Sequence, residues 1–100
     1  MELGLQLGYW GRGPDPTTLD KVRQAEAMGF DSLWTAEAWG SDALTPLAWY
    51  GSHTTTLKLG QSITQMSART PAATAMAMNT LQHLSDGRVI CGLGVSGPQV

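Results

Sequence analysis

The sequence has little of what several large classes of protein require. It contains a single cysteine, Cys91, so an intramolecular disulfide is excluded. Its two histidines, His53 and His83, stand far apart along the chain, and together with one cysteine they give no spacing typical of a metal site. We therefore expect no bound metal, and we expect Cys91 to behave as a small hydrophobic residue in a strand.

Charged residues and long apolar runs are also scarce. Six Lys and Arg stand against eight Asp and Glu, which gives a formal net charge of −2, and the chain contains no basic cluster. No nucleic-acid partner is therefore expected. The opening residues lack the charged and apolar regions of a secretory signal, and no apolar run approaches the ~18 residues of a membrane span. We expect a cytoplasmic protein without a membrane partner.

Alternating strand and helix patterns are what the sequence does contain. Residues 3–7 place leucine at every second position, which is typical of a strand with two different faces. The next segment keeps a helical stripe of apolar residues between Thr17, an expected N-cap, and Gly29, an expected stop. The first unit of the chain is therefore predicted to be a strand followed by a helix.

The same unit recurs along the rest of the chain. Residues 31–39, 57–63 and 88–94 read as strands, and residues 41–53 and 70–84 read as helices, the first capped by Ser41-Asp42 and the second by Thr70-Pro71. Strands that begin near residues 3, 32, 58 and 88 are spaced close to the ~31 residues per unit of a (β/α)₈ barrel. Four parallel strands alternating with helices are therefore predicted.

An open doubly wound sheet and a closed barrel both fit this α/β alternation. The glycines favour the barrel, because small residues recur on one face of the strands, at Gly4, Gly8, Gly60, Gly92 and Gly94. Four strands cannot close a barrel. We therefore expect residues 1–100 to be the first four βα units and N-terminal half of a TIM-type (β/α)₈ barrel, an incomplete domain. It would belong to a homo-oligomer or pair with the missing half.

The spacing G-x-G-x-x-G occurs at Gly92, Gly94 and Gly97. A dinucleotide-binding fingerprint needs a first βα turn, a helix that opens on the last glycine and an acidic residue about 20 positions later. Here the glycines follow the fourth strand, and Pro98 comes directly after the last of them. We interpret Gly92 and Gly94 as small residues of a barrel wall, with Ser96 and Gly97 presenting hydrogen-bond donors at its mouth.

Several segments carry a resemblance to a known family. "GFDSLW" at residues 29–34, the helix from Arg69 onward, "LSDGR" at 84–88 and the glycine strand after it occur in the order found in the luciferase-like monooxygenase superfamily. The sequence is most similar to its deazaflavin (F420)-dependent oxidoreductases. The resemblance implies a TIM-like barrel that binds F420 at its C-terminal mouth. It also implies hydride transfer between this cofactor and a small-molecule substrate.

The resemblance also implies the site residues. Ser62 and Ile63 match a bulge whose non-prolyl cis peptide supports one face of the deazaflavin, and Thr64 and Gln65 follow it. Further cofactor contacts are implied for Glu37, Trp39, Gly94, Ser96 and Gly97. Arg69 matches a family arginine that either ties a carboxylate or contacts the ligand.

No general acid or base follows from this comparison. Ala38 occupies the place of a histidine that some members use for proton transfer, which leaves the neighbouring Glu37 as the remaining candidate for a catalytic role. Two alternatives stay open. One is an FMN-dependent monooxygenase of the same superfamily, and the other is a non-catalytic half-barrel segment that needs a partner chain.

Overall fold

The computed structural model describes residues 1–9, 15–38 and 40–95. The elements, in chain order, are β1 (Gly4–Gln6), α1 (Thr18–Ala27), β2 (Ser32–Thr35), α2 (Leu44–Gly51), β3 (Lys58–Gln61), β4 (Thr64–Gln65), a 3₁₀ turn η1 (Met66–Ala68), α3 (Pro71–Leu84), β5 (Val89–Ile90) and β6 (Leu93–Gly94). Strand and helix alternate as the sequence predicts.

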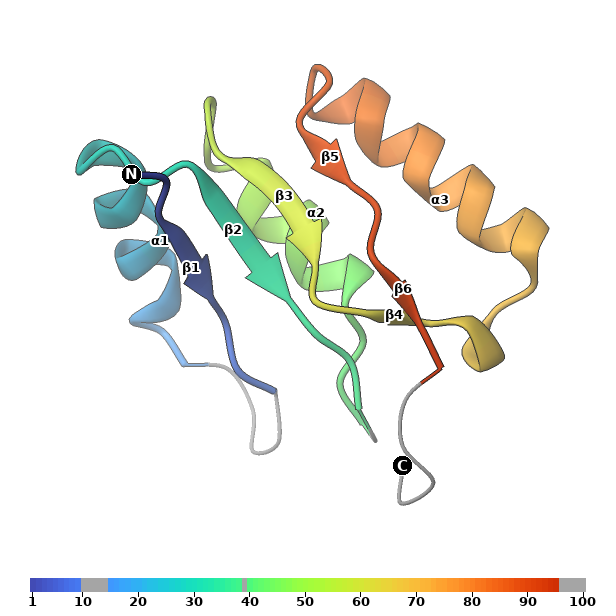
Figure 1. The fold of residues 1–100 in the computed structure, drawn as a ribbon. Helices are drawn as coiled ribbons and strands as arrows, with labels where there is room; N and C mark the ends of the chain where they lie inside the picture. Colours follow the sequence, from blue (N-terminus) through green and yellow to red (C-terminus); the bar gives the residue numbers. More distant parts are fainter. Residues whose placement is uncertain (10–14, 39, 96–100) are drawn as a thin grey trace.

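The main sheet has the strand order β1-β2-β3-β5, and every pair in it is parallel. Across the sheet the strands therefore follow one another in chain order, and the order never reverses. A second small ladder joins β4 to β6, also in parallel, and continues the surface beyond β3 and β5 (Figure 1). An open doubly wound sheet would contain a reversal of strand order, which this part of the chain lacks.

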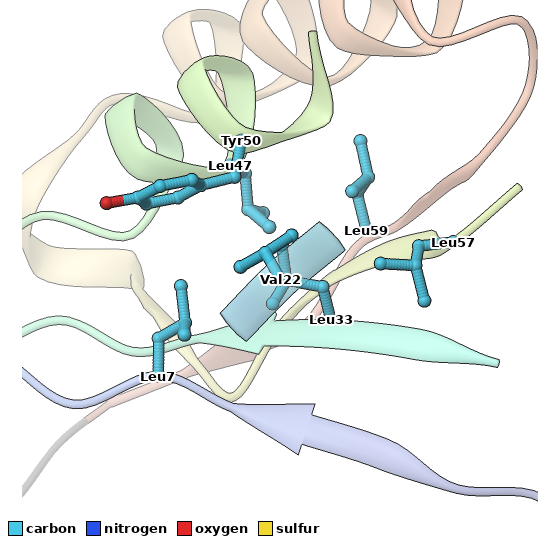
Figure 2. Close-up of a cluster of buried hydrophobic side chains, with 7 residues drawn as sticks. All are labelled: Leu7, Val22, Leu33, Leu47, Tyr50, Leu57 and Leu59. Atoms are coloured by element: carbon cyan, nitrogen blue, oxygen red, sulfur yellow. The ribbon is translucent and has the colours of Figure 1, made fainter. Parts of the chain in front are cut away.

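The helices decide between the two architectures, because all three pack on the same face of the sheet (Figure 1). Val22 of α1 and Leu47 of α2 meet Leu33 and Leu59 of the strands in one buried cluster (Figure 2). Leu81 of α3 is buried on the same side as α2. Helices on one face only are the arrangement of a barrel wall, so the predicted barrel-type fold is confirmed.

The opposite face of the sheet corresponds to the interior of such a barrel. Trp34 lies there between two glycines of the flanking strands, Gly4 and Gly60, with its indole nitrogen donating to the Ser32 hydroxyl at 2.8 Å. A Cβ at Gly60 would overlap the Trp34 ring. Two of the glycines that favoured a barrel in the sequence, Gly4 and Gly60, therefore make room for one large side chain of β2.

Two charged side chains fasten the loops at the N-terminal edge of the strands. Glu26, near the end of α1, accepts hydrogen bonds from the backbone N–H groups of residues 55–57 at 2.8–3.2 Å. Arg88, just before β5, uses its guanidinium to donate to the carbonyls of Gly51, Thr54, Leu57 and Ser85 and to the Thr54 hydroxyl, at 2.7–3.1 Å. These contacts tie α1 and β5 to the loop between α2 and β3.

Local details differ from the sequence predictions in two places. The fourth strand is not continuous, because Cys91 and Gly92 separate β5 from β6; Cys91 is exposed at this break on the sheet edge, not buried in a strand. The Thr17 side chain makes no capping bond, since its hydroxyl and the Thr17 N–H both donate to Asp15, two residues earlier. At the other two helices Asp42 and Thr70 accept backbone N–H groups of the first turn, as predicted.

Arg88 gives a direct test of the loop network. We expect Arg88→Lys to lower the free energy of unfolding of the complete protein by on the order of 2–3 kcal/mol, because an ammonium group cannot reach several carbonyls at once and leaves buried acceptors unpaired. Denaturant unfolding measures the change. The matched control is Arg23→Lys on the exposed surface of α1, which should change stability little. Equal effects of the two substitutions would contradict the role given to Arg88.

Candidate functional site

The C-terminal ends of the parallel strands meet at one edge of the sheet. The segments that follow β1, β2 and β3, together with β6, lie at this edge (Figure 1). In parallel α/β folds ligands bind at this edge, where the strand ends and their loops face one space. Most of the described candidate residues, from Glu37 to Gly94, are gathered there.

The centre of the edge is the short bulge of residues 62–65, where the chain leaves β3 and enters β4. The Ser62 N–H still donates to the Thr35 carbonyl of β2 at 2.6 Å, whereas the Thr64 N–H donates to the Gly92 carbonyl at 2.8 Å. Ile63 between them has a φ of +83°, which a β-branched residue rarely adopts. The backbone thus changes its hydrogen-bond partner from β2 to the segment after β5 within three residues, and the change of direction occurs at Ile63.

The geometry of Ile63 replaces the one expected from the resemblance. No peptide bond in the described residues is cis, so the cis Ser62-Ile63 bond was wrong for this structure. The positive φ of Ile63 produces the change of direction instead. The side chain of Ile63 is 43% exposed, and Gly94 lies against it so closely that a Cβ there would come within 2.5 Å of Ile63 Cγ2. Ile63 is therefore an apolar surface presented at the edge.

The other residues of the bulge have different environments. The Ser62 hydroxyl donates to the side-chain oxygen of Gln6 at 2.7 Å and joins the ends of β1 and β3 on the inner face. Thr64 is fully buried, and its hydroxyl has no partner among the described residues. Thr64 thus lies beneath the surface that Ile63 forms. The backbone N–H of Gln65 donates to Glu37 at 2.6 Å.

Glu37, two residues beyond β2, is the most highly connected side chain at the edge. Its Oε1 accepts from the Gln65 N–H and from Arg69 Nη1, both at 2.6 Å, and its Oε2 accepts from Arg69 Nη2 at 2.8 Å and from the Ala43 N–H at 3.0 Å. The Glu37 side chain is 5% exposed and that of Arg69 is 19% exposed. Of the two roles left open for Arg69, this structure shows the tie to a carboxylate.

The ionisation of Glu37 follows from these contacts. Burial raises the pKa of its carboxyl, but the hydrogen bonds from Arg69 and from the two backbone N–H groups outweigh burial, and the pKa is lowered below 4.5. The hydrogen bonds to Glu37, together with the negative charges of Glu37 and of Asp42 at 4.0 Å, raise the pKa of Arg69 above its usual value. An ionised carboxylate that already accepts four hydrogen bonds is poorly suited to be a general acid.

Gly92 and Gly94 follow β5 where a side chain would not fit. A Cβ at Gly92 would overlap the Gln61 carbonyl oxygen of β3. The Gly92 N–H donates to the buried side chain of Gln61 at 3.1 Å, whose amide nitrogen has no partner among the described residues. These glycines therefore permit close contact between the strands. Of the other candidates, Trp39, Ser96 and Gly97 lie outside the described residues.

Sequence reasoning missed two features of this edge. It did not pair Glu37 with Arg69, which is 32 positions further along the chain, although an acid just after a strand and an arginine just before a helix were both noted. It also gave no role to Gln61, which is 2% exposed. A polar residue on the strand face that also carries Leu59, toward the helices, was the one available signal for Gln61.

Comparisons with known proteins place the chain in a family. The family described as luciferase-like monooxygenase matches residues 12–100, and the chain belongs to it. A Mycobacterium tuberculosis protein named "Putative coenzyme F420-dependent oxidoreductase" is 64% identical over 100 residues, all of this chain and 29% of its own length. A 5,10-methylenetetrahydromethanopterin reductase of Methanolobus tindarius is 35% identical over 73% of this chain and 23% of its own. The chain thus spans less than a third of these relatives.

Solved structures show the same fold. The coenzyme F420-dependent tetrahydromethanopterin reductase of Methanopyrus kandleri superposes with a TM-score of 0.82 at 28% identity, over 98% of this chain and 28% of its own. The oxygenating constituent of 3,6-diketocamphane monooxygenase of Pseudomonas putida, in complex with FMN, gives 0.81 at 22% identity, over 99% of this chain and 31% of its own. The second likeness concerns the fold alone.

Within the described residues, no helix is long and apolar enough to cross a membrane.

The lowered pKa of Glu37 makes stability depend on pH in a defined direction. The unfolded state binds the proton near the usual value of 4.5, while the folded state resists it. The contribution of Glu37 is therefore present above this value and is lost as the pH falls through the lower folded-state pKa. We expect Glu37→Gln to flatten part of the acid loss of stability in the complete protein.

Urea midpoints measured from about pH 6 down to about pH 3 test this expectation. Glu26 also has a lowered pKa, so the variant should retain part of the acid dependence. Glu2→Gln, a change of an exposed carboxylate, is the control and should leave the wild-type profile unchanged. A Glu37→Gln profile parallel to that of the wild type would contradict the assignment.

Proposed function

We propose that the complete protein containing this chain is an F420-dependent oxidoreductase that transfers a hydride between the deazaflavin and a small organic substrate. The observation that carries the proposal is the 64% identity to the Mycobacterium tuberculosis relative, in an alignment that covers the whole chain and therefore includes the strand-end edge. Bound F420 would supply the hydride chemistry, and the protein would supply binding and orientation.

The described residues fit a flat ring at this edge. Ile63 offers an exposed apolar side chain at the strand ends, and this side chain packs over Gly94, where a Cβ would not fit. We propose that Ile63 supports one face of the ring, and that Ser62 and Gln65 flank it with polar groups. Thr64 and Glu37 would lie beneath the surface that the ring contacts and would support it, because both side chains are buried. Contacts from Trp39, Ser96 and Gly97 stay predictions, as does a cytoplasmic location.

Titration of the complete protein with F420 and with FMN tests the proposed cofactor. We expect F420 to bind, as followed by its absorbance and fluorescence, and FMN to bind more weakly. Ile63→Asp should weaken F420 binding by about tenfold or more, because a desolvated charge would face the ring. Leu3→Asp is the matched control and should leave F420 binding unchanged. Leu3 is also 43% exposed, but it directly precedes β1, at the N-terminal edge of the sheet away from the bulge.

Other outcomes separate the alternatives. Retention of FMN without F420 would overturn the proposal in favour of a flavin-dependent monooxygenase. A folded complete protein that binds neither cofactor would support the non-catalytic alternative.

We also propose that the complete protein forms a homo-oligomer through the outer surface of α2 and α3. Neither helix contains Asp, Glu, Lys or Arg, whereas α1 carries Asp20, Lys21, Arg23 and Glu26. The outer surface exposes Trp49 at 65%, Met76 at 65% and Leu84 at 76%. The rest of a barrel would continue the sheet beyond β1 and β5 and add helices beside α1 and α3, which leaves the groove between α2 and α3, lined by Trp49 and Leu84, on the outside. A second copy fits the surface, because two uncharged faces meet without like-charge repulsion in a two-fold interface.

Light scattering after size-exclusion chromatography checks the oligomer. Leu84→Glu should shift the complete protein toward the monomer mass, because it places a charge in an apolar interface. Met28→Glu, at the 74% exposed methionine that ends α1, is the control and should leave the mass unchanged. A wild-type protein of monomer mass would refute the proposed interface.

A further inference from the structure

The bulge at residues 62–65 lacks a complete strand partner on one side. β2 ends at Thr35, whose carbonyl accepts the Ser62 N–H, so β2 offers no further carbonyl to the residues after Ser62. The Gln65 N–H is satisfied instead by the side chain of Glu37, at 2.6 Å. A carboxylate thus takes the place that the backbone of a longer β2 would have taken.

Glu37 links more than these two strands. The same carboxylate holds the guanidinium of Arg69 by two hydrogen bonds and accepts the Ala43 N–H at the start of α2. Arg69 directly precedes the N-cap of α3, and Asp42 lies 4.0 Å from its second nitrogen. One buried ion pair therefore connects the end of β2, the start of α2, the bulge and the entry to α3.

The bulge needs such support, because its conformation is strained. A β-branched residue held at positive φ costs about 1–3 kcal/mol and persists only where its surroundings determine it. Ile63 is confined on one side by Gly94 and Gly92, and the next fixed point along the chain is the hydrogen bond from Gln65 to Glu37. If this point were released, the bulge could relax toward an ordinary extended conformation.

We propose that Glu37 and Arg69 are positioning residues, which hold the 62–65 bulge in the shape on which the cofactor ring rests and take no part in proton transfer. The proposal rests on the proposed function for the identity of the ligand. The mechanical role of the pair does not depend on which cofactor binds. Since all acceptor positions of Glu37 are used within the protein, its influence on a ligand is exerted through Ile63 and Gln65.

A structural role alone would also make Glu37 and Arg69 sensitive to substitution. The chain offers a matched control, because Glu26 is likewise a carboxylate that accepts several backbone N–H groups from another loop, but at the opposite edge of the sheet. Glu26→Gln should therefore reduce stability without altering the bulge. Glu37→Gln should reduce stability and alter the bulge as well.

Two measurements on the complete protein separate these roles. Hydrogen exchange resolved to residues 62–65 reports the bulge without any ligand. We expect Glu37→Gln and Arg69→Lys to raise exchange there, at matched global stability, while Glu26→Gln leaves it unchanged. Titration with F420 should show about tenfold weaker binding for Glu37→Gln, equal to ~1.4 kcal/mol, and a change within about twofold for Glu26→Gln.

The outcomes distinguish this proposal from that of the cofactor. Unchanged exchange at residues 62–65 in both Glu37→Gln and Arg69→Lys would overturn the positioning role, whichever cofactor binds. Equal weakening of F420 binding by Glu26→Gln and Glu37→Gln would overturn it too. Raised exchange in a protein that binds FMN in place of F420 would sustain the positioning role and reject the proposed cofactor. If Glu37→Gln fails to fold, Arg69→Lys, which keeps the positive charge, gives the same two readouts.

Discussion

The buried Glu37 carboxylate at the end of β2 is the contact on which the strand-end edge depends. The strands of the main sheet are at most four residues long, so the backbone ladder alone satisfies few of the polar groups in the loops. Side chains complete the hydrogen bonding at both ends. Glu37 does so at the C-terminal edge, and Glu26 and Arg88 do so at the N-terminal edge. Breaking a buried pair of this kind would leave an uncompensated charge.

The sequence predicts the order of elements because that order rests on local signals. Apolar periodicity, the Thr70-Pro71 helix start and the stop at Gly29, which has a φ of +88°, are all read within a few residues. The choice of a barrel over an open sheet needed the structure, since it depends on helices far apart in sequence packing on one face. The break of the fourth strand at Cys91 and Gly92 also has no local signal, because the contact made there is with the Gln61 carbonyl of β3, 31 positions earlier in the chain.

The location of the site was predictable from the sequence, but the hydrogen bonds and the ion pair within it were not. Parallel strands bring Glu37, Ile63, Gln65 and Gly94 to one edge whatever their side chains do. The pairing of Glu37 with Arg69 joins two loops through tertiary contacts, and neither periodicity nor spacing encodes it. The fold itself does not choose a cofactor either. Structures of an F420-dependent reductase and of an FMN complex match this chain with nearly equal TM-scores. Any choice between the two ligands must lie in individual residues.

Trp34 on the inner face has a consequence for how this sequence can change over time. Its ring occupies the volume that side chains at Gly60 and Gly4 would fill, so the three positions share one space. A larger residue at Gly60 becomes acceptable only after Trp34 has become smaller, and a smaller residue at Trp34 leaves a void until a glycine is replaced. Substitutions at these positions are therefore expected to be epistatic. Among related sequences the large residue should move between neighbouring strands, and should be neither lost nor duplicated.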